Sequence, residues 1–371
     1  MRGRTLPLNS IKVEHLESHA ALEEFARFPL RVYGGRDAWW PPDVQNEIDL
    51  LAGRSPFAGF LDVRPICARR DGHTVARVCA VINRRHNQHW NEALGLLTHF
   101  EALEAEDAAV AAMLDDAIQW LRGRQMRAVR SGFAAFLDYP YAIDNYGRLP
   151  SFLLRGNPAS YHRHFKDAGF VTERGQADFT AELSPDLVAR YQDIVAGARA
   201  GNLAIRTWRE FGFLAAIDAW TGVTNAAFAR HWGWYPIKRT EVRPMLTSLW
   251  NTPVADLSII AVKGGEPIGT VFSVPDFSQT LASVRPGVKL DADLGGGTRG
   301  ALINIGVLEN ARGRGVAVAM ATRSFLEMAN RGIRYAGYTL VLDDNWPSRR
   351  TAAALGARVT SNFVTYRRDL R

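Results

Sequence analysis

The residues best suited to chemistry form one short segment between a predicted strand and a predicted amphipathic helix. The first turn of a helix presents unpaired backbone N–H groups and a favourable dipole, so it binds anions well. Gly313 and Gly315 allow a ligand to approach the backbone closely, and Arg312 and Arg314 add positive charge. We therefore predict a pyrophosphate site made of Arg312, Gly313, Arg314, Gly315, Val316 and Ala317.

The elements that position this segment belong to an internal repeat. Residues 66–81 and 259–274 each read as a strand, a two-residue turn and a strand. In both halves a further strand, an amphipathic helix and a closing Asn–helix–Gly segment follow. The fold class is therefore α/β, with duplicated, mixed and mostly antiparallel sheets flanked by helices. The sequence leaves open whether the two sheets join.

We predict a lobe boundary at residue 175, which gives an N-terminal lobe of residues 1–175 and a C-terminal lobe of residues 176–371. The repeat aligns Ala105-Glu-Asp-Ala108 with residues 312–315, so carboxylates replace the glycine and arginine. Carboxylates and phosphates in close contact repel by about 1 kcal/mol or more. We therefore expect the phosphate loop in the C-terminal lobe alone.

The C-terminal lobe also contains an aromatic-rich insertion, residues 205–250. Aromatic side chains suit a groove for an amphiphilic acceptor, although they also pack added helices against a sheet. Glycine and proline mark residues 232–236 as a loop. We predict acceptor contacts from Trp232, Trp234 and Tyr235. His231 is the candidate general base because its unperturbed pKa lies near neutrality, and a structural role is the alternative.

The remaining composition sets broad limits. The net charge of +7 and the pI near 9.6 favour anionic partners. We expect a cytoplasmic protein, either free or attached to the inner membrane surface through Trp39-Trp40 and basic residues. The alternative role for Trp39-Trp40 is a buried aromatic plug.

Cys67 and Cys79 flank a hairpin turn and are expected opposite Ala76 and Arg64, too far out of register for a disulfide. No metal site is predicted.

The strand, the Arg-x-x-Gly-x-Ala segment at a helix start, Asn345 and Leu355-Gly356-Ala357 together resemble the GNAT acyltransferase superfamily. The resemblance implies that residues 312–317 and Asn345 bind acyl-CoA. It also implies that the preceding strand splays from its neighbour, so that backbone N–H groups polarise the thioester carbonyl while an amine attacks directly. These N–H groups would belong to Ile305, Gly306 and Val307.

Nearly the whole chain resembles a bacterial family of long, tandem-lobed GNAT-like proteins. The resemblance is carried by residues 224–236, Val274-Pro-Asp276, Gly306-Val-Leu308 and Leu342-Asp-Asp-Asn345. Some similar proteins act as bacterial ceramide synthases. Two positions depart from the usual GNAT pattern: Ala352 replaces a common tyrosine acid, and Ala301 lies near the position of a glutamate base. The general acid and base therefore cannot be assigned from the family.

The leading hypothesis is an N-acyltransferase that moves a long-chain acyl group from acyl-CoA to a sphingoid-base-like amine. Three alternatives remain open at this point. The chain could acetylate a small amine from acetyl-CoA. It could transfer an aminoacyl group from tRNA, although a nucleic-acid partner is disfavoured because such enzymes need no CoA loop. It could also bind acyl-CoA without catalysis. Acyl length, acceptor and oligomeric state are not predicted.

Overall fold

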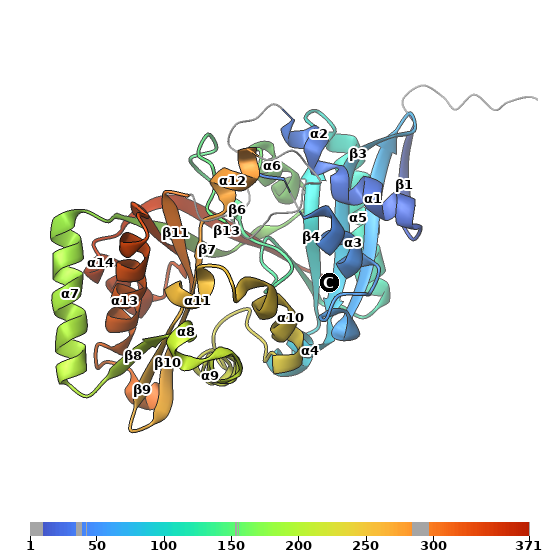
Figure 1. Cartoon of the computed structure of the whole chain (residues 1–371). Coiled ribbons are helices and arrows are strands. Elements are labelled where there is room, and N and C mark those ends of the chain that lie inside the picture. The colour runs from blue at the N-terminus through green and yellow to red at the C-terminus, as the bar shows by residue number, and fades with distance from the viewer. Residues whose placement is uncertain are drawn as a thin grey trace, which may run out of the picture.

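The computed structural model describes residues 10–34, 39–41, 43–152, 154, 156–283 and 297–370. Two lobes lie side by side and share one 13-stranded sheet (Figure 1). The strand order is β1-β2-β3-β4-β5-β13-β7-β12-β11-β10-β9-β8, and β6 pairs with β13 outside this path. The expected α/β class with mostly antiparallel sheets is confirmed, and the open question is answered because the two sheets are continuous.

The first lobe consists of strands on which helices pack from both faces. Its elements are β1 Ile11–His15, α1 His19–Arg27, α2 Pro29–Tyr33, α3 Val44–Leu51, η1 Ala58–Phe60, β2 Leu61–Arg70, β3 His73–Asn83, α4 Arg84–Trp90, β4 Leu94–Ala102, α5 Asp107–Gly123, β5 Ala128–Ser131, β6 Tyr141–Ala142, α6 Ser160–Asp167 and β7 Val171–Glu182.

The second lobe repeats this plan, with α8 to α11 before its hairpin where the first lobe has α1 to α3. Its elements are α7 Pro185–Ala200, β8 Ala204–Thr207, α8 Trp208–Phe211, α9 Phe213–Ala227, α10 Arg239–Leu249, α11 Val254–Leu257, β9 Ile259–Lys263, β10 Glu266–Pro275, α12 Ser278–Ser283, β11 Arg299–Val307, η3 Glu309–Ala311, α13 Val316–Asn330, β12 Tyr335–Leu342, α14 Trp346–Ala354 and β13 Arg358–Asp369.

The two lobes exchange their closing strands at the centre of the sheet. β7 ends the first half of the chain but pairs with β12 of the second lobe, from Tyr335↔Glu182 to Leu342↔Gln176. β13 ends the second half and pairs with β5 of the first lobe. β7 and β13 also pair with each other. The predicted boundary at residue 175 falls inside β7, so no linker separates the lobes there.

Three large hydrophobic clusters stabilise this arrangement. One lies under α5 in the first lobe and one under α13 in the second. The largest is shared, since it contains Phe25 and Phe60 of the first lobe with Trp208, Trp220 and Trp234 of the second. Burial of each large apolar side chain contributes about 1.5–3 kcal/mol. The contact between the lobes is therefore part of the protein core.

The first hairpin corrects one detail of the sequence prediction. Its turn lies at Asp71-Gly72, as expected, but Cys67 lies opposite Arg77 and Cys79 opposite Pro65. The predicted pairing was one residue off because a β-bulge beside the turn shifts the register after Ala68. Both cysteines are nevertheless free and buried.

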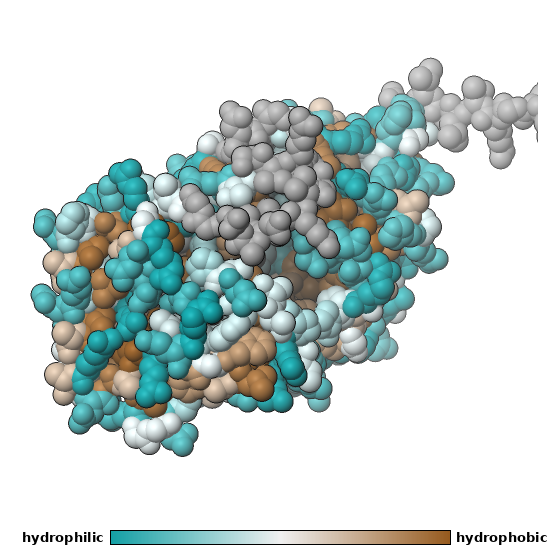
Figure 2. Space-filling view, in the orientation of Figure 1, coloured by the Kyte–Doolittle hydropathy of each residue, from teal (hydrophilic) through white to brown (hydrophobic). Residues whose placement is uncertain are grey.

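The face drawn in Figure 2 is largely hydrophilic, with hydrophobic patches of which one lies near α9. Within the described ranges, no helix has both the length and the apolarity required to span a bilayer. Trp39 stacks on Tyr33 with ring centroids 5.2 Å apart, and Trp40 packs against Phe152 at 6.0 Å. Trp40 also contacts the shared core, which fits the plug alternative better than an exposed membrane anchor. Pro42 lies outside the described residues.

Candidate active site

The predicted phosphate loop connects β11 to α13 through a turn that leaves its backbone accessible. Gly313 has φ +74° and Gly315 has φ +76°, values that side chains rarely adopt. Gly315 is the N-cap of α13, and a Cβ built on either glycine would meet no atom within 4 Å. Val316 is buried in the second-lobe core and anchors the first helical turn. No side chain caps the start of α13, so its first N–H groups are left for an anion to bind.

The two arginines of this loop have different surroundings. The Arg312 guanidinium donates from Nε to the Val307 carbonyl (3.0 Å) and from Nη2 to the Ala227 carbonyl (2.9 Å). Arg312 therefore ties the end of β11 to the end of α9. Arg314 is exposed and makes no ion pair with any residue that the structure describes. Of the two predicted phosphate contacts, Arg314 therefore has its guanidinium available for a ligand. The Arg312 guanidinium already binds two backbone carbonyls.

Strands β11 and β12 separate next to this loop. Their parallel pairing runs from Arg299↔Tyr335 to Leu302↔Tyr338 and stops there, while β11 stays paired with β10 as far as Val307. Ile305, Gly306 and Val307 lie beyond the last β11–β12 pair. A Cβ on Gly306 would come within 3.2 Å of the Ala227 Cβ, so this glycine allows α9 to pack closely. The separation leaves the β12-facing edge of residues 303–307 outside the ladder.

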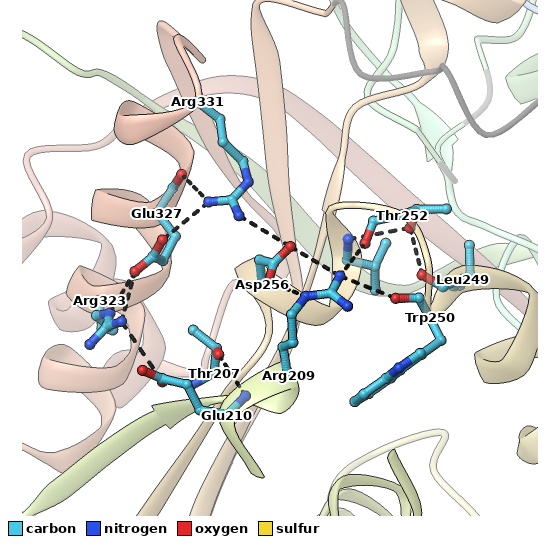
Figure 3. A network of polar contacts seen from close by, with 11 residues as sticks. Thr207, Arg209, Glu210, Leu249, Trp250, Thr252, Asp256, Arg323, Glu327 and Arg331 are labelled. Carbon is cyan, nitrogen blue, oxygen red and sulfur yellow. Dashed lines mark hydrogen bonds and ion pairs between the residues drawn. The ribbon is translucent and has the colours of Figure 1, made fainter. Parts of the chain in front are cut away.

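Helix α13 is held firmly by a network of charged residues (Figure 3). Arg331 contacts Asp256 of α11 at 3.1 Å, and Arg209 of α8 contacts the same carboxylate at 2.5 Å. Glu327 accepts from both Arg323 and Arg331. The helix that follows the phosphate loop is therefore fixed to the helices of the insertion.

The first lobe differs at the equivalent position. β4 is joined to α5 by residues 103–106, whereas residues 308–315 join β11 to α13. The N-cap of α5 is Glu106, so Glu106 and not Ala108 corresponds to Gly315; the sequence alignment was off by two residues because the second connection is longer. Glu106 pairs with Arg70 at 2.9 Å. The absence of a CoA site here stays a prediction, which the shorter, acidic connection supports.

His231 lies in the loop of residues 228–236, which we call the acceptor loop. Its Nδ1 lies 3.1 Å from the Trp232 carbonyl. A carbonyl can only accept, so Nδ1 carries the proton and Nε2 carries the lone pair. Burial lowers the pKa of His231 below 6.5, and the Trp232 hydrogen bond partly opposes this shift. His231 is therefore neutral near pH 7, as a general base must be.

The aromatic residues of the acceptor loop pack against the first lobe. The Trp232 ring stacks on Phe133 at 5.2 Å, with the Arg130 guanidinium 4.5 Å from its centroid. Trp234 is 8% exposed and Tyr235 is 2% exposed. The Tyr235 hydroxyl donates to the Ala135 carbonyl at 3.1 Å. Trp234 and Tyr235 are thus packing residues in this conformation, whereas Trp232 retains partial exposure and its predicted acceptor contact stays a prediction.

The remaining predicted residues lie near the end of β12. Asn345 caps α14 by accepting from the Ser348 backbone N–H at 3.2 Å. Ala301 and Ala352 are fully buried, so neither position supplies an acid or a base. In the described part of the chain, no cluster of three or more His, Cys, Asp or Glu residues could hold a metal ion.

Tyr338 is a residue that the sequence reasoning missed. It occupies the last β11–β12 pair, directly before the strands separate. Burial raises the pKa of Tyr338 to about 12, and a hydrogen bond with Ser348 of α14 opposes that rise. Ser348 lies one helical turn before Ala352, where many GNAT enzymes have their tyrosine. No motif marks a tyrosine in the middle of a strand, so only the structure places this phenol beside α14.

Comparison with known proteins finds a family match and distant sequence relatives. Residues 223–357 match the Acetyltransferase (GNAT) family. The bacterial ceramide synthase of Caulobacter vibrioides is 22% identical over 280 residues, which cover 74% of this chain and 72% of the relative. Protein YghO of Escherichia coli is 20% identical over 276 residues, which cover 71% and 68%.

Two solved structures show the same fold over the whole chain. A GCN5-related N-acetyltransferase from Sphaerobacter thermophilus superposes with a TM-score of 0.56 at 16% identity, covering 97% of this chain and 96% of its own. A tandem GNAT protein from the clavulanic acid biosynthesis pathway gives a TM-score of 0.57 at 11% identity, covering 97% and 98%.

The fold is that of the tandem GNAT proteins, and the segment with the phosphate loop is the one that matches the GNAT family. Residues 223–357 match the GNAT family, and the relatives and solved structures named above are similar to the chain outside that segment as well. Both findings support an N-acyltransferase, and the co-substrate that GNAT enzymes use is acyl-CoA.

Proposed function

We propose that this enzyme transfers a long-chain acyl group from acyl-CoA to the primary amine of a sphingoid-base-like acceptor. The observation that carries the acceptor class is the similarity to a bacterial ceramide synthase over 74% of the chain. The aromatic acceptor loop supports it, because an amphiphilic substrate needs apolar surface beside the reacting amine.

The proposed cofactor contacts are the backbone of residues 312–317, Arg314 and Asn345. The open space above Gly313 and Gly315 fits a pyrophosphate, since a side chain there would fill it. Bound acyl-CoA supplies an activated acyl carbon. The N–H groups on the free edge of β11 are suited to stabilise the negative charge that develops on the carbonyl oxygen.

His231 Nε2 is the proposed acceptor of the proton from the substrate ammonium. The free amine then forms the C–N bond while the C–S bond breaks, and the CoA sulfur leaves as a thiolate that must gain a proton. The nitrogen loses its second proton as the amide forms, and this proton restores the group that protonated the thiolate. Tyr338 is the candidate donor, because its position next to the strand separation brings a phenol near α14. The products are an amide and free CoA.

The test is release of free CoA thiol by the purified protein. Long-chain acyl-CoA with a sphingoid-like amine should give turnover, and omission of the amine should abolish it. Faster turnover with acetyl-CoA and a small polar amine would instead favour the acetyltransferase alternative. Ribonuclease-sensitive transfer would favour a tRNA substrate. Tight CoA binding without turnover over a broad amine panel would refute catalysis.

A further inference from the structure

Three side chains of one short helix from the other lobe bind backbone carbonyls of the acceptor loop. His89 of α4 donates from Nε2 to the Ala229 carbonyl at 2.8 Å. Trp90 donates from Nε1 to the Trp234 carbonyl at 2.6 Å. Arg85 donates to the Pro236 carbonyl at 3.3 Å. Three donors on α4 thus bind carbonyls at the start, middle and end of the loop.

Arg85 adds an ion pair that fixes the exit of the loop. Its two terminal nitrogens contact the Glu241 carboxylate at 2.7 and 2.6 Å, and Glu241 in turn accepts from the Lys238 backbone N–H at 2.8 Å. The guanidinium also lies 3.9 Å from the centroid of the Phe60 ring. Both partners are largely buried, so this pair is screened less than a surface ion pair.

Helix α4 is itself fixed at both ends and along its length. Asn83 caps its first turn by accepting from the His86 N–H at 2.9 Å, and Asn91 ends it with φ +49°. The Asn87 amide donates to the Leu94 carbonyl at 3.0 Å and so attaches the helix to β4. A helix fixed in this way can transmit the position of the first-lobe sheet to the loop that it binds.

The hydrogen bonds continue from α4 to His231. The Trp234 N–H donates to the His231 carbonyl at 3.0 Å, and the carbonyl of the same Trp234 accepts from Trp90. Gly233 has φ +77°, and a Cβ there would come within 2.6 Å of the Phe133 ring. The turn that contains His231 therefore packs between α4 and Phe133, which both belong to the first lobe.

From this arrangement we infer that α4 is a positioning clamp for the acceptor site, with Arg85, His89 and Trp90 as positioning residues. This inference rests on the proposed role of His231. It assigns a task to the first lobe: that lobe sets the place of the acceptor amine relative to an acyl group bound in the second lobe.

The test compares Trp90→Phe with Trp120→Phe. The first change keeps a ring but removes the N–H that binds the Trp234 carbonyl. The second makes the same change in the same lobe, on α5, where the Trp120 ring contacts the Arg124 guanidinium at 4.0 Å. His89→Ala provides an independent second variant, because His89 contacts the loop from a more exposed position.

Two measurements should respond in Trp90→Phe and His89→Ala but not in Trp120→Phe. Amide hydrogen exchange in residues 228–236 should accelerate about tenfold, the typical effect of one lost hydrogen bond. The KM for the acceptor amine should rise about tenfold while the KM for acyl-CoA stays constant. Unchanged exchange in both clamp variants, or an equal change in Trp120→Phe, would overturn the clamp. Hydrogen exchange needs no substrate, so this result stands even if the acyl transfer proposed above is refuted.

Discussion

Replacing Gly315 with alanine separates the cost of backbone strain from the loss of a ligand contact. Gly315 has φ +76°, and a Cβ there meets no protein atom within 4 Å. The expected loss of folding stability is therefore that of a left-handed alanine alone, about 1–2 kcal/mol. In the complex, however, the added methyl would occupy the space above the first turn of α13, where the pyrophosphate is proposed to lie.

Gly332 provides a matched control at the opposite end of the same helix. It has φ +77°, and a Cβ there also meets nothing within 4 Å. Gly332→Ala should therefore cost the same 1–2 kcal/mol or so in chemical denaturation. Isothermal titration should nevertheless show that Gly315→Ala binds CoA at least about tenfold more weakly, which equals 1.4 kcal/mol. The affinity of Gly332→Ala for CoA should be unchanged.

The outcome that refutes this reasoning is specific. If Gly315→Ala binds CoA with the wild-type Kd, the phosphates do not lie against the start of α13. If both variants lose affinity equally, the effect comes from the stability of the helix, and the site assignment loses its support.

Three further predictions concern the lobes, the base and the core. Residues 176–371 alone lack the start of β7, residues 171–175, and leave β13 without β5, so they should fail to fold; a cooperative unfolding transition followed by circular dichroism would contradict this. In the pH profile of kcat/KM, activity should fall at acid pH, and the fall should lie below pH 6.5 because burial lowers the pKa of His231. His231→Gln should remove this pH dependence. An acidic fall that persists in the variant would exclude His231 as the base. The same shift means that the free energy of unfolding decreases as the pH falls from 6.5 through the lower pKa of folded His231, because the unfolded state takes up the proton first. Glu47→Gln leaves the fully buried Arg77 without its ion-pair partner and should cost about 3–5 kcal/mol in urea unfolding, whereas the exposed Glu23→Gln should cost little; equal losses would contradict this reasoning.

Local turn chemistry made much of the fold predictable. Asp71-Gly72 and Gly264-Gly265 form the hairpin turns with positive φ, a conformation that glycine and aspartate tolerate. The repeat gave the order of elements correctly, and the loop between β11 and α13 was found from its glycines. These features are encoded by residues that are adjacent in the sequence, so periodicity and turn signals suffice.

Features that depend on distant contacts were not predictable. Nothing in the pattern of β7 or β13 tells which lobe it joins, because either strand could fill either gap in the sheet. The hydrogen bonds from α4 to the acceptor loop join side chains to backbone carbonyls 140 or more residues away, and backbone carbonyls have no sequence signature. The role of Arg312 as a link between β11 and α9 was missed for the same reason.

The exchange of β7 and β13 has a consequence for biosynthesis. Strands β5 and β7 both pair with β13, which is residues 358–369. Until these residues have been translated, β5 and β7 each have an unpaired edge. The first lobe therefore cannot complete its sheet on the ribosome before the second lobe has been made. Completion of the sheet is a late step that depends on contacts between distant parts of the chain. During that interval the nascent protein is most vulnerable to aggregation, and a chaperone that covers strand edges would help it most.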